Sequence, residues 1–599
     1  MNSQTIRDIA IHSAKTYYNY LKDNEKGLQI IDVFDIKPVQ TGTNLQLFLR
    51  LSAKIVNQES IFILLRTNGK KYCVLSMGIE EEEKTDETEG DEMLENNEEV
   101  EHRSVQFLNY DENKHLLGIE VGKKNVEEFT GLNNKDIFVI SDLTFLVERV
   151  REWYDKNGAK IALPVNVSIL KNKINQIEYL EGLEPSENQK HSLHNIFIHP
   201  FTYIWGAPGT GKTQFVLAYA VLHYIRNGHR VGILAPTNNA LEQVLRGVIK
   251  MTDKAGISRQ VIERMGIPSK AFAEEFPEVC PKLKKERESF EKEEEIEKQK
   301  NIQLIACTLD CYSAAFRDKK MNVQHIFLDE AGYANMIKAG MLFNHKIPIT
   351  LLGDHAQLPP VCELNDFSIE KEREFENMFL WAQTSIYLET LFDLTKEEVR
   401  YQYLKNITPS LKRVSQSSLN TSYRFGENLA KVLGYHVYSL DFSSGNRDSV
   451  TKIRYIHAPK EEAYKSRESI TEVIAIKRLV AALKMRGTTN YAILTPYKKQ
   501  VKLLGLHLPN ERNEQRIITV HGSQGREWDT VIVSITDTAD KWFVDSLNLA
   551  SRGLNLVNTA VSRARKELII VCDTNYWKRQ TGQLIYDLIR IGEEVKDTI

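Results

Sequence analysis

The stretch GAPGTGKT at residues 206–213 constrains the fold of this chain more than any other part of its sequence. It fits the phosphate-loop pattern G-x-x-x-x-G-K-[ST]. An apolar, aromatic run at residues 201–205 precedes it and reads as a strand, and residues 214–226 follow with the apolar spacing of a helix. Because strand, loop and helix are all in place, the sequence predicts a site for a nucleoside triphosphate.

The residues of this loop have distinct predicted roles. Gly206, Gly209 and Gly211 let backbone N–H groups turn toward phosphates, and the following helix adds the positive end of its dipole. Lys212 is expected to reach the β- and γ-phosphates of ATP, and the Thr213 hydroxyl is expected to hold Mg²⁺.

Strand-like runs alternate with helical patterns around the loop, which is typical of a doubly wound parallel α/β sheet. These runs lie at residues 203–205, 231–234, 304–306, 325–328 and 349–352. A second α/β set begins near residue 411, with runs at residues 491–494, 517–520, 530–534 and 568–571 and no second phosphate loop. The sequence therefore predicts two parallel-sheet domains that share one nucleotide site.

The N-terminal part of the chain has a different pattern. After a predicted helix at residues 1–24, seven short β-like runs separated by turn residues lie between residues 28 and 140, and a helix is expected at residues 143–157. Many short strands of this kind indicate a small barrel or a sandwich.

Charge is unevenly distributed along the 599 residues. Residues 79–101 carry 13 acidic residues and one lysine, so removing their net −12 from the chain's −3 leaves +9 elsewhere. We expect a solvated acidic loop, with a nucleic-acid mimic that guards a basic groove as the alternative reading. The remaining positive balance permits contacts to a phosphate backbone.

Targeting and cysteine patterns favour a cytoplasmic protein. No apolar run approaches the ~18 residues of a membrane span, and the polar N-terminus does not resemble a signal peptide. The six cysteines form no C-x-x-C pair, so we expect neither a zinc cluster nor a disulfide framework.

Two further strand ends carry polar side chains suited to phosphate chemistry. The run HIFLDE ends in Asp329 and Glu330, which suit Mg²⁺ binding and activation of the attacking water, respectively. The next strand ends in LLGDHAQLPP, where Asp354 and Gln357 can sense the γ-phosphate.

The order of these motifs resembles the superfamily 1 helicases, in particular the 5′→3′ branch that contains the nonsense-mediated-decay RNA helicase and the Dna2-type helicases. The resemblance implies that Gln189 recognises adenine and that Tyr423 stacks on it. It also implies that Arg424 and Arg563 are arginine fingers from the second domain, and that Glu527 hydrogen-bonds near the nucleotide. In that reading Lys212, Glu330, Gln357 and both arginines are the catalytic set.

The same resemblance implies a set of residues that contact the nucleic-acid strand. They are Thr237, Asn238, Thr495, Pro496, Thr519 and His521. DNA and RNA stay equally open, because the contacts that distinguish them depend on local geometry.

The implied fold is α/β, with two RecA-like parallel-sheet motor domains, a small N-terminal β-barrel and a helical insertion. The expected domains are an N-terminal helix at 1–24, a barrel domain with the acidic loop and linking helices at 25–180, a first motor domain at 181–410 with a helical insertion at 251–300, and a second motor domain at 411–599.

The function implied is an ATP-dependent helicase or translocase that moves 5′→3′ on single-stranded or tailed nucleic acid. The alternative is a nucleic-acid-triggered ATPase switch that clamps a strand or recruits a partner without processive unwinding. No nuclease motif is evident, so any cutting in DNA repair or phage defence is expected from a separate nuclease partner.

Overall fold

The computed structural model describes residues 1–75, 103–112, 114–165, 167–170, 176–280, 301–364, 377–405, 408–446, 448–460, 467–536 and 553–595. The predicted acidic loop at residues 79–101 lies outside these residues. So does the part of the predicted helical insertion at residues 281–300.

The N-terminal strands close into a barrel, so the barrel alternative holds and the sandwich alternative does not. Its seven strands follow the order β1-β2-β6-β5-β4-β3-β7, and β7 pairs with β1. They are β1 (Leu28–Thr41), β2 (Asn44–Leu51), β3 (Ile61–Leu65), β4 (Lys71–Leu75), β5 (Arg103–Asp111), β6 (Leu116–Val121) and β7 (Ile137–Asp142). Alternate side chains of these strands fill the interior with aliphatic and aromatic groups, which explains the short-strand pattern of the sequence.

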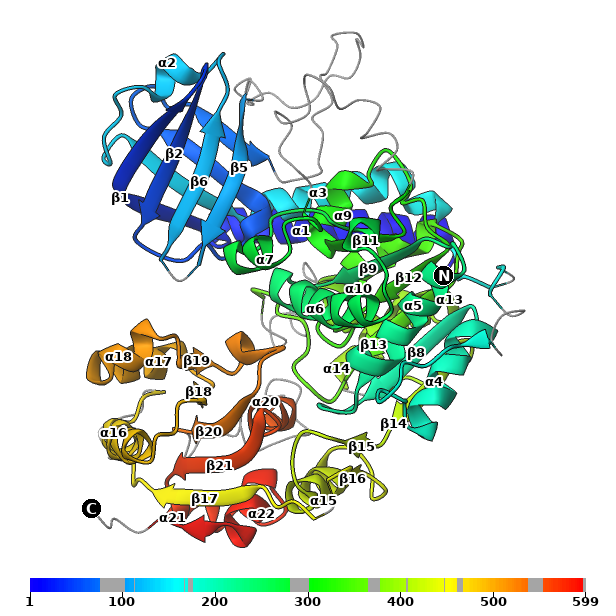
Figure 1. Ribbon diagram of the computed structural model, residues 1–599, viewed down its shortest axis with the longest axis vertical. Coiled ribbons are helices and arrows are strands. Elements are labelled where there is room, and N and C mark those ends of the chain that lie inside the picture. Colours follow the sequence, from blue (N-terminus) through cyan, green and yellow to red (C-terminus); the bar gives the residue numbers. More distant parts are fainter. Residues whose placement is uncertain are drawn as a thin grey trace.

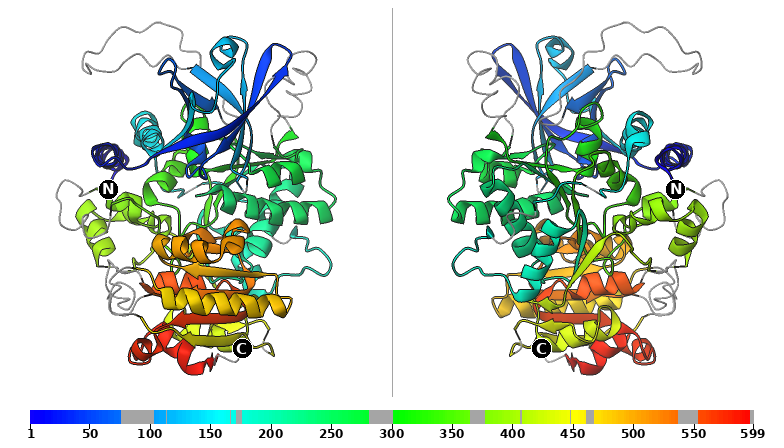
Figure 2. Two further views of the ribbon diagram at one scale, coloured as in Figure 1. Left: turned by 90° about the vertical axis from the view of Figure 1, so that its left-hand side faces the viewer. Right: turned by 90° about the vertical axis from the view of Figure 1, so that its right-hand side faces the viewer.

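Two long helices attach the barrel to the rest of the chain. Helix α1 (Ser3–Asp23) lies beside α3 (Leu143–Asn157), as Figure 2 shows, and Asn2 and Asp142 cap their N-termini. Their apolar faces, with Tyr17 and Trp153, share one core with the neighbouring parallel-sheet domain. The barrel is therefore anchored on that domain, and Figure 1 shows it at the opposite end of the molecule from the C-terminus.

The first parallel sheet has seven strands in the order β10-β11-β9-β12-β13-β8-β14. They are β8 (Phe201–Gly206), β9 (Val231–Ala235), β10 (Ile262–Arg264), β11 (Leu304–Thr308), β12 (His325–Leu328), β13 (Ile349–Gly353) and β14 (Ser415–Leu419). Helices α4 (Glu187–Ile198), α5 (Ala218–Arg226) and α6 (Asn238–Lys254) cover one face, while α3, α9 (Leu309–Ala315) and α10 (Met336–Gly340) cover the other. The predicted doubly wound α/β domain is confirmed.

Both edges of this sheet differ from the sequence-based expectation. Strand β14 pairs in parallel with β8, although the boundary predicted at residue 411 would assign it to the second domain. Strand β10 pairs with β11 and lies inside the predicted helical insertion, followed by the short helix α7 (Lys270–Glu275). Edge strands are short and less apolar than central ones, so their hydrophobic signal is weak.

The second parallel sheet has six strands in the order β19-β18-β20-β21-β17-β22. They are β17 (Lys452–His457), β18 (Tyr491–Thr495), β19 (Ile517–Thr519), β20 (Trp528–Ser534), β21 (Ala564–Cys572) and β22 (Glu593–Glu594). Helices α15 (Glu427–His436), α20 (Gly553–Val561) and α22 (Leu584–Ile591) pack on one face, and α16 (Ile470–Met485) and α17 (Lys498–His507) on the other. Two α/β domains are thus present, with β15 (Thr421–Ser422) and β16 (Ser443–Ser444) as a small ribbon at their junction.

The described helices include none that is both long and apolar enough to cross a lipid bilayer.

A buried histidine on β12 makes stability depend on pH. His325 bonds to the Tyr224 hydroxyl and to Thr350 Oγ1, each at 2.8 Å, and burial lowers its pKa to about 3. The unfolded chain takes up a proton near pH 6.5, so the unfolded state gains relative stability as the pH falls below that value. We expect the free energy of unfolding to fall by about 2 kcal/mol between pH 7 and pH 5 through this group.

Chemical denaturation from pH 8 to pH 5 measures this slope. The variant His325→Gln should flatten it, whereas His191→Gln, which changes an exposed histidine, should not. An unchanged slope in His325→Gln would contradict the assignment.

Candidate active site between the two α/β domains

The phosphate loop leaves β8 with a backbone that only glycine accommodates easily. Gly209 and Gly211 have φ values of +78° and +81°, in the left-handed region. At Gly206, a Cβ atom would lie 2.5 Å from Thr210 Oγ1. Lys212 then opens a π-helical turn, η4 (Lys212–Leu217), which leads into α5. The predicted loop geometry is therefore present, and the helix begins with a turn that is common at functional sites.

Lys212 is a half-buried cation whose hydrogen bonds, among the described residues, are to carbonyls of its own loop. Its Nζ donates to the carbonyl of Gly206 and, at 3.3 Å, to that of Ala207. Burial lowers its pKa, and the nearby Asp354 and Glu330 partly oppose that shift. An ammonium group of this kind is well suited to an anionic ligand.

The predicted metal residues meet at the ends of η4 and β12. Thr213 Oγ1 donates to Asp329 Oδ2 at 2.9 Å, although the two residues are far apart in sequence. Burial and then the charge of Glu330 raise the pKa of Asp329 to about 6. A hydroxyl and a carboxylate side by side form the oxygen donor set that Mg²⁺ prefers, so these residues fit the ion.

Glu330 follows Asp329 with an unusual backbone conformation. Its φ is +51°, in the left-handed region, and its carbonyl accepts from the N–H groups of Tyr333 and Ala334. A non-glycine residue in this region costs about 1–3 kcal/mol and is frequent at functional sites.

Gln357 is held in a network at the end of β13. Its Nε2 donates to Asp354 Oδ2 at 2.9 Å, and its Oε1 accepts from Arg563 Nη2 at 2.9 Å. Asp354 also accepts from Trp205 Nε1 at 3.0 Å. The predicted sensor thus contacts one predicted arginine finger directly.

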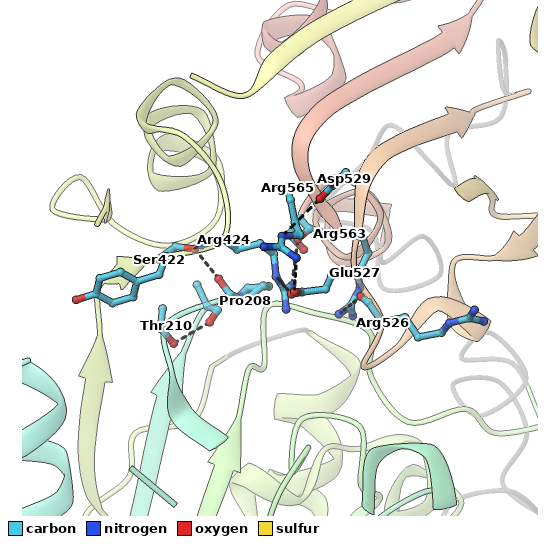
Figure 3. A network of polar contacts seen from close by, with 12 residues as sticks. Pro208, Thr210, Ser422, Arg424, Arg526, Glu527, Asp529, Arg563 and Arg565 are labelled. Atoms are coloured by element: carbon cyan, nitrogen blue, oxygen red, sulfur yellow. Dashed lines mark hydrogen bonds and ion pairs between the residues drawn. The ribbon is translucent and has the colours of Figure 1, made fainter. Parts of the chain in front are cut away.

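The second domain contributes a strand that lies against the phosphate loop (Figure 3). Ser422 Oγ donates to the Pro208 carbonyl, and the Tyr423 N–H donates to the Gly209 carbonyl, both at 2.8 Å. A Cβ at Gly209 would lie 2.5 Å from Arg424 Cβ. The absence of a side chain at Gly209 therefore allows the two domains to approach closely.

The two predicted arginine fingers lie side by side in this cleft. Arg424 forms an ion pair with Glu527 through Nε at 2.7 Å and donates to the Ser562 carbonyl at 3.1 Å. Arg563 is 4 % exposed, and burial, followed by the charge of Arg424, lowers its pKa to about 10. Its Nε has no hydrogen-bond partner within the described part of the chain. The half-buried Lys212 and Arg424 and the buried Arg563 thus form a cationic cluster, in which the Nε of Arg563 has unused donor capacity.

The residues predicted to hold adenine lie next to the loop but make contacts of different kinds. Gln189 is buried as part of the capping box of α4, and its Nε2 donates to the Thr210 carbonyl at 2.9 Å. Tyr423 is 47 % exposed, and its ring lies against Gly445, where a Cβ atom would overlap it. Tyr423 is thus about half exposed, whereas the side chain of Gln189 is bonded to the phosphate loop itself.

The residues predicted to contact a nucleic-acid strand differ in how far they are exposed and in whether their side chains are already hydrogen-bonded. Asn238 Nδ2 donates to Gln58 Oε1 of the barrel at 3.0 Å, and its Oδ1 accepts from the buried Arg264 at 2.7 Å. Thr495 is fully buried at the end of β18. Thr495 is thus enclosed here, whereas Asn238 is half-buried with its amide bonded on both sides.

The other predicted strand contacts lie at the surface between the two domains. Thr237 caps α6, and Pro496, Thr519 and His521 are half-buried. Pro496 directly follows β18, Thr519 is the last residue of β19, and His521 lies two residues beyond it. Burial lowers the pKa of His521. Nearby, Asn239 of α6 donates to the Gln524 carbonyl at 3.0 Å, so both domains contribute to this surface.

Some residues of the cleft were not predicted. Asn555 and Asn558 on α20 donate to backbone carbonyls of residues 355–357, and Thr559 Oγ1 accepts from the Leu358 N–H. Their spacing places them on one face of a helix, and this polar stripe in an otherwise apolar helix is a signal that could have identified them. Tyr438 also bonds to Asp354.

Comparison with known proteins supports this two-part arrangement. Two family models, both described as "AAA domain", match residues 189–363 and 399–575. These matches cover most of the two parallel-sheet regions, including every residue of the cleft described above.

Individual relatives are distant. The regulator of nonsense transcripts 1 homolog of Arabidopsis thaliana is 22% identical over 459 residues, which cover 69% of this chain and 35% of that protein. The DNA replication ATP-dependent helicase/nuclease DNA2 of Homo sapiens is 23% identical over 411 residues, covering 65% and 37%. The 3'-5' exoribonuclease HELZ2 of Mus musculus is 26% identical over 289 residues, covering 45% and 9%.

The chain therefore spans little more than a third, or less, of the length of these relatives. Among solved structures, the arterivirus nonstructural protein 10 helicase is 12% identical with a TM-score of 0.37, covering 87% of this chain and 79% of that one.

Proposed function

We propose that this chain, which belongs to the superfamily 1 helicases of the Upf1 and Dna2 type, is an ATP-dependent helicase that moves 5′→3′ along single-stranded nucleic acid. ATP is the substrate, and we place the protein in the cytoplasm. The direction of movement rests on the family branch, and the roles of individual residues rest on the contacts described above.

One observation supports hydrolysis in particular. The phosphate loop of the first domain and the two guanidinium groups of the second meet at the contact between the two domains, where Arg563 is buried and Arg424 is half-buried. Phosphoryl transfer is catalysed mainly by positioning and by positive charge, and here part of that charge comes from a separate domain. Opening or closing of the cleft would therefore switch hydrolysis, so that chemistry is coupled to domain motion.

Each residue has a role in this proposal. Thr213 and Asp329 would hold Mg²⁺, which when bound neutralises phosphate charge. Glu330 would accept a proton from the attacking water, and Gln357 would orient that water next to Arg563. Tyr423 would stack on the adenine, and Gln189 would support the loop beneath it.

The strand would bind across the surface that both domains form beside α6. Thr237, Pro496, Thr519 and His521 lie at the carboxyl ends of parallel strands, which is where ligands bind in open α/β sheets. We expect contacts to the phosphate backbone to dominate, so binding should weaken steeply as salt increases.

The decisive experiment is ATP hydrolysis titrated with single-stranded DNA and, separately, with single-stranded RNA. We expect at least one polymer to stimulate turnover, and we expect Lys212→Ala to abolish it, because that change removes the cation of the loop. If neither polymer stimulates turnover and Lys212→Ala has no effect, the motor function is wrong.

A second function fits the same cleft: an ATPase switch that clamps nucleic acid or recruits a partner, such as a nuclease in repair or phage defence. One contact of the barrel favours this alternative. Gln58 is bonded to Asn238, so the barrel occupies one of the groups that were predicted to contact the strand. Strand displacement on duplexes with 5′ or 3′ tails separates the two functions. Displacement from the 5′-tailed duplex alone supports the helicase, whereas strong ATPase activity without displacement supports the switch.

A further inference from the structure

Asp354 is a buried carboxylate that connects the two domains at the active site. It accepts hydrogen bonds from Trp205 Nε1, the Ala356 N–H and Gln357 Nε2 of its own domain, at 2.9 to 3.0 Å. It also accepts one from the Tyr438 hydroxyl of the second domain, at 2.8 Å. Of these four hydrogen bonds, the one from Tyr438 forms only when the two domains are in contact.

Tyr438 lies outside every motif that the sequence identifies. It follows the C-terminus of α15, and its ring packs at the edge of the core of the second domain, 4.8 Å from the ring of Phe442. Burial and the nearby Asp354 raise its pKa, so the hydroxyl keeps its proton and acts as the donor to Asp354. Asn558 Nδ2 donates to the same hydroxyl at 2.9 Å and fixes its orientation.

The network continues from Asp354 to the catalytic arginine. Asp354 Oδ2 accepts both from Tyr438 and from Gln357 Nε2, and Gln357 Oε1 in turn accepts from Arg563. An amide that donates with its nitrogen must present its oxygen on the other side, toward the guanidinium group. The carboxylate therefore determines which way Gln357 faces.

We propose that Tyr438 is a positioning residue for ATP hydrolysis: its hydroxyl, donated across the cleft to Asp354, holds Gln357 in register with Arg563 when the two domains close. This inference rests on the proposed function. In this proposal Tyr438 does not contact the nucleotide. Its bond to Asp354 couples closure of the two domains to the orientation of Gln357, the group that orients the attacking water.

The loop that carries Gln357 is constrained in the same direction. Asn555 Nδ2 donates to the carbonyls of His355 and Gln357 at 3.1 and 2.7 Å, and Asn558 donates to that of Ala356 at 2.9 Å. These bonds fix the backbone of the loop on α20, whereas Tyr438 fixes the side-chain network. Loss of the hydroxyl alone should thus leave the loop docked and disturb only the orientation of Gln357.

The test is Tyr438→Phe, which keeps the ring and removes one oxygen. We expect kcat for strand-stimulated ATP hydrolysis to fall about tenfold, since one hydrogen bond to a charged group is lost. The KM for ATP, the affinity for a fluorescent ADP and the melting temperature should change little. Tyr435→Phe is the matched control, because Tyr435 lies three residues earlier and is exposed.

A double variant distinguishes positioning from general stabilisation. If Tyr438 acts through Gln357, adding Tyr438→Phe to Gln357→Ala should cause no further loss of kcat. The reciprocal change Asp354→Asn should reproduce the loss of kcat at unchanged ADP affinity.

Two outcomes would overturn the role of Tyr438: unchanged kcat in Tyr438→Phe, or a full additional tenfold loss in the Gln357→Ala background. The absence of strand-stimulated hydrolysis in the unmodified protein would instead overturn the proposed function. The two failures are therefore distinguishable.

Discussion

Replacing Arg563 by alanine is expected to lower kcat for ATP hydrolysis about a thousandfold, the lower end of the effect of an arginine finger. Arg563 is 4 % exposed and its guanidinium group is bonded to Gln357, while its Nε has no hydrogen-bond partner within the described part of the chain. Because burial already lowers its pKa to about 10, the group is a cation held out of water that an anion would stabilise. Its pKa still keeps it charged at neutral pH.

The affinity for nucleotide should change far less than kcat. Arg563 belongs to the second domain, whereas the phosphate loop that binds the nucleotide belongs to the first. Fluorescent-nucleotide binding and steady-state turnover, measured on the same preparation, give the two quantities. Arg563→Lys should restore little activity, because an ammonium group cannot reproduce the planar fork that reaches Gln357.

The matched control is Arg565→Ala. Arg565 lies two residues further along β21, is half exposed and forms ion pairs with Glu527 and Asp529 at 3.7 and 3.8 Å. Exposed ion pairs with separations of this length contribute little to folding stability, so the kcat of Arg565→Ala should stay within about threefold of that of the unmodified protein. If the two variants lost activity to the same extent, the assignment of Arg563 would be wrong.

Replacing Glu330 by glutamine is expected to lower kcat by about a thousandfold while nucleotide and strand binding persist. The change preserves shape but removes the basic oxygen, and general-base catalysis is commonly worth about 10²–10⁴-fold. The backbone of Glu330 is in the left-handed region at φ +51°, held by the N–H groups of Tyr333 and Ala334 that bond to its carbonyl. Because glutamine has the same backbone preferences, the variant should fold normally.

The expected signature is a trapped complex. With ATP present, Glu330→Gln should release a labelled single strand more slowly than the unmodified protein, because the bound nucleotide is not hydrolysed. Glu514→Gln serves as the control, since Glu514 is an exposed partner of Arg516 in the second domain. Rapid turnover by Glu330→Gln would exclude Glu330 as the base and direct attention to Asp329.

The central strands of the first sheet, the barrel strands and four strands of the second sheet could be predicted because each carries its own apolar run between turn residues, whereas β17, which lies inside the second sheet, was missed. The phosphate loop, the Asp329–Glu330 pair and the Asp354–Gln357 loop could be predicted from the sequence in the same way, because each lies at the end of such a strand. Parallel strands align their carboxyl ends, so these segments had to converge. Their convergence is a consequence of local pattern and sheet geometry alone.

Other features depended on partners remote in sequence. Strand β14 has a polar pattern and joins the first sheet only because β8 offers a free edge there. The sequence predicts Asn238 as a donor to the nucleic-acid strand. In the structure its amide is bonded to the barrel residue Gln58 and to the buried Arg264, which are remote from it in sequence.

The residue types proposed for the chemistry are all legible in local motifs: a phosphate loop, two carboxylates at a strand end and two arginines in a second α/β domain. The contacts that hold these parts together, such as the hydrogen bond between Tyr438 and Asp354, emerge from the folded arrangement. This difference arises because a motif encodes its own backbone conformation through short-range sterics and hydrogen bonds. A hydrogen bond across a domain interface depends instead on the packing of both domains, to which residues far apart in the chain contribute.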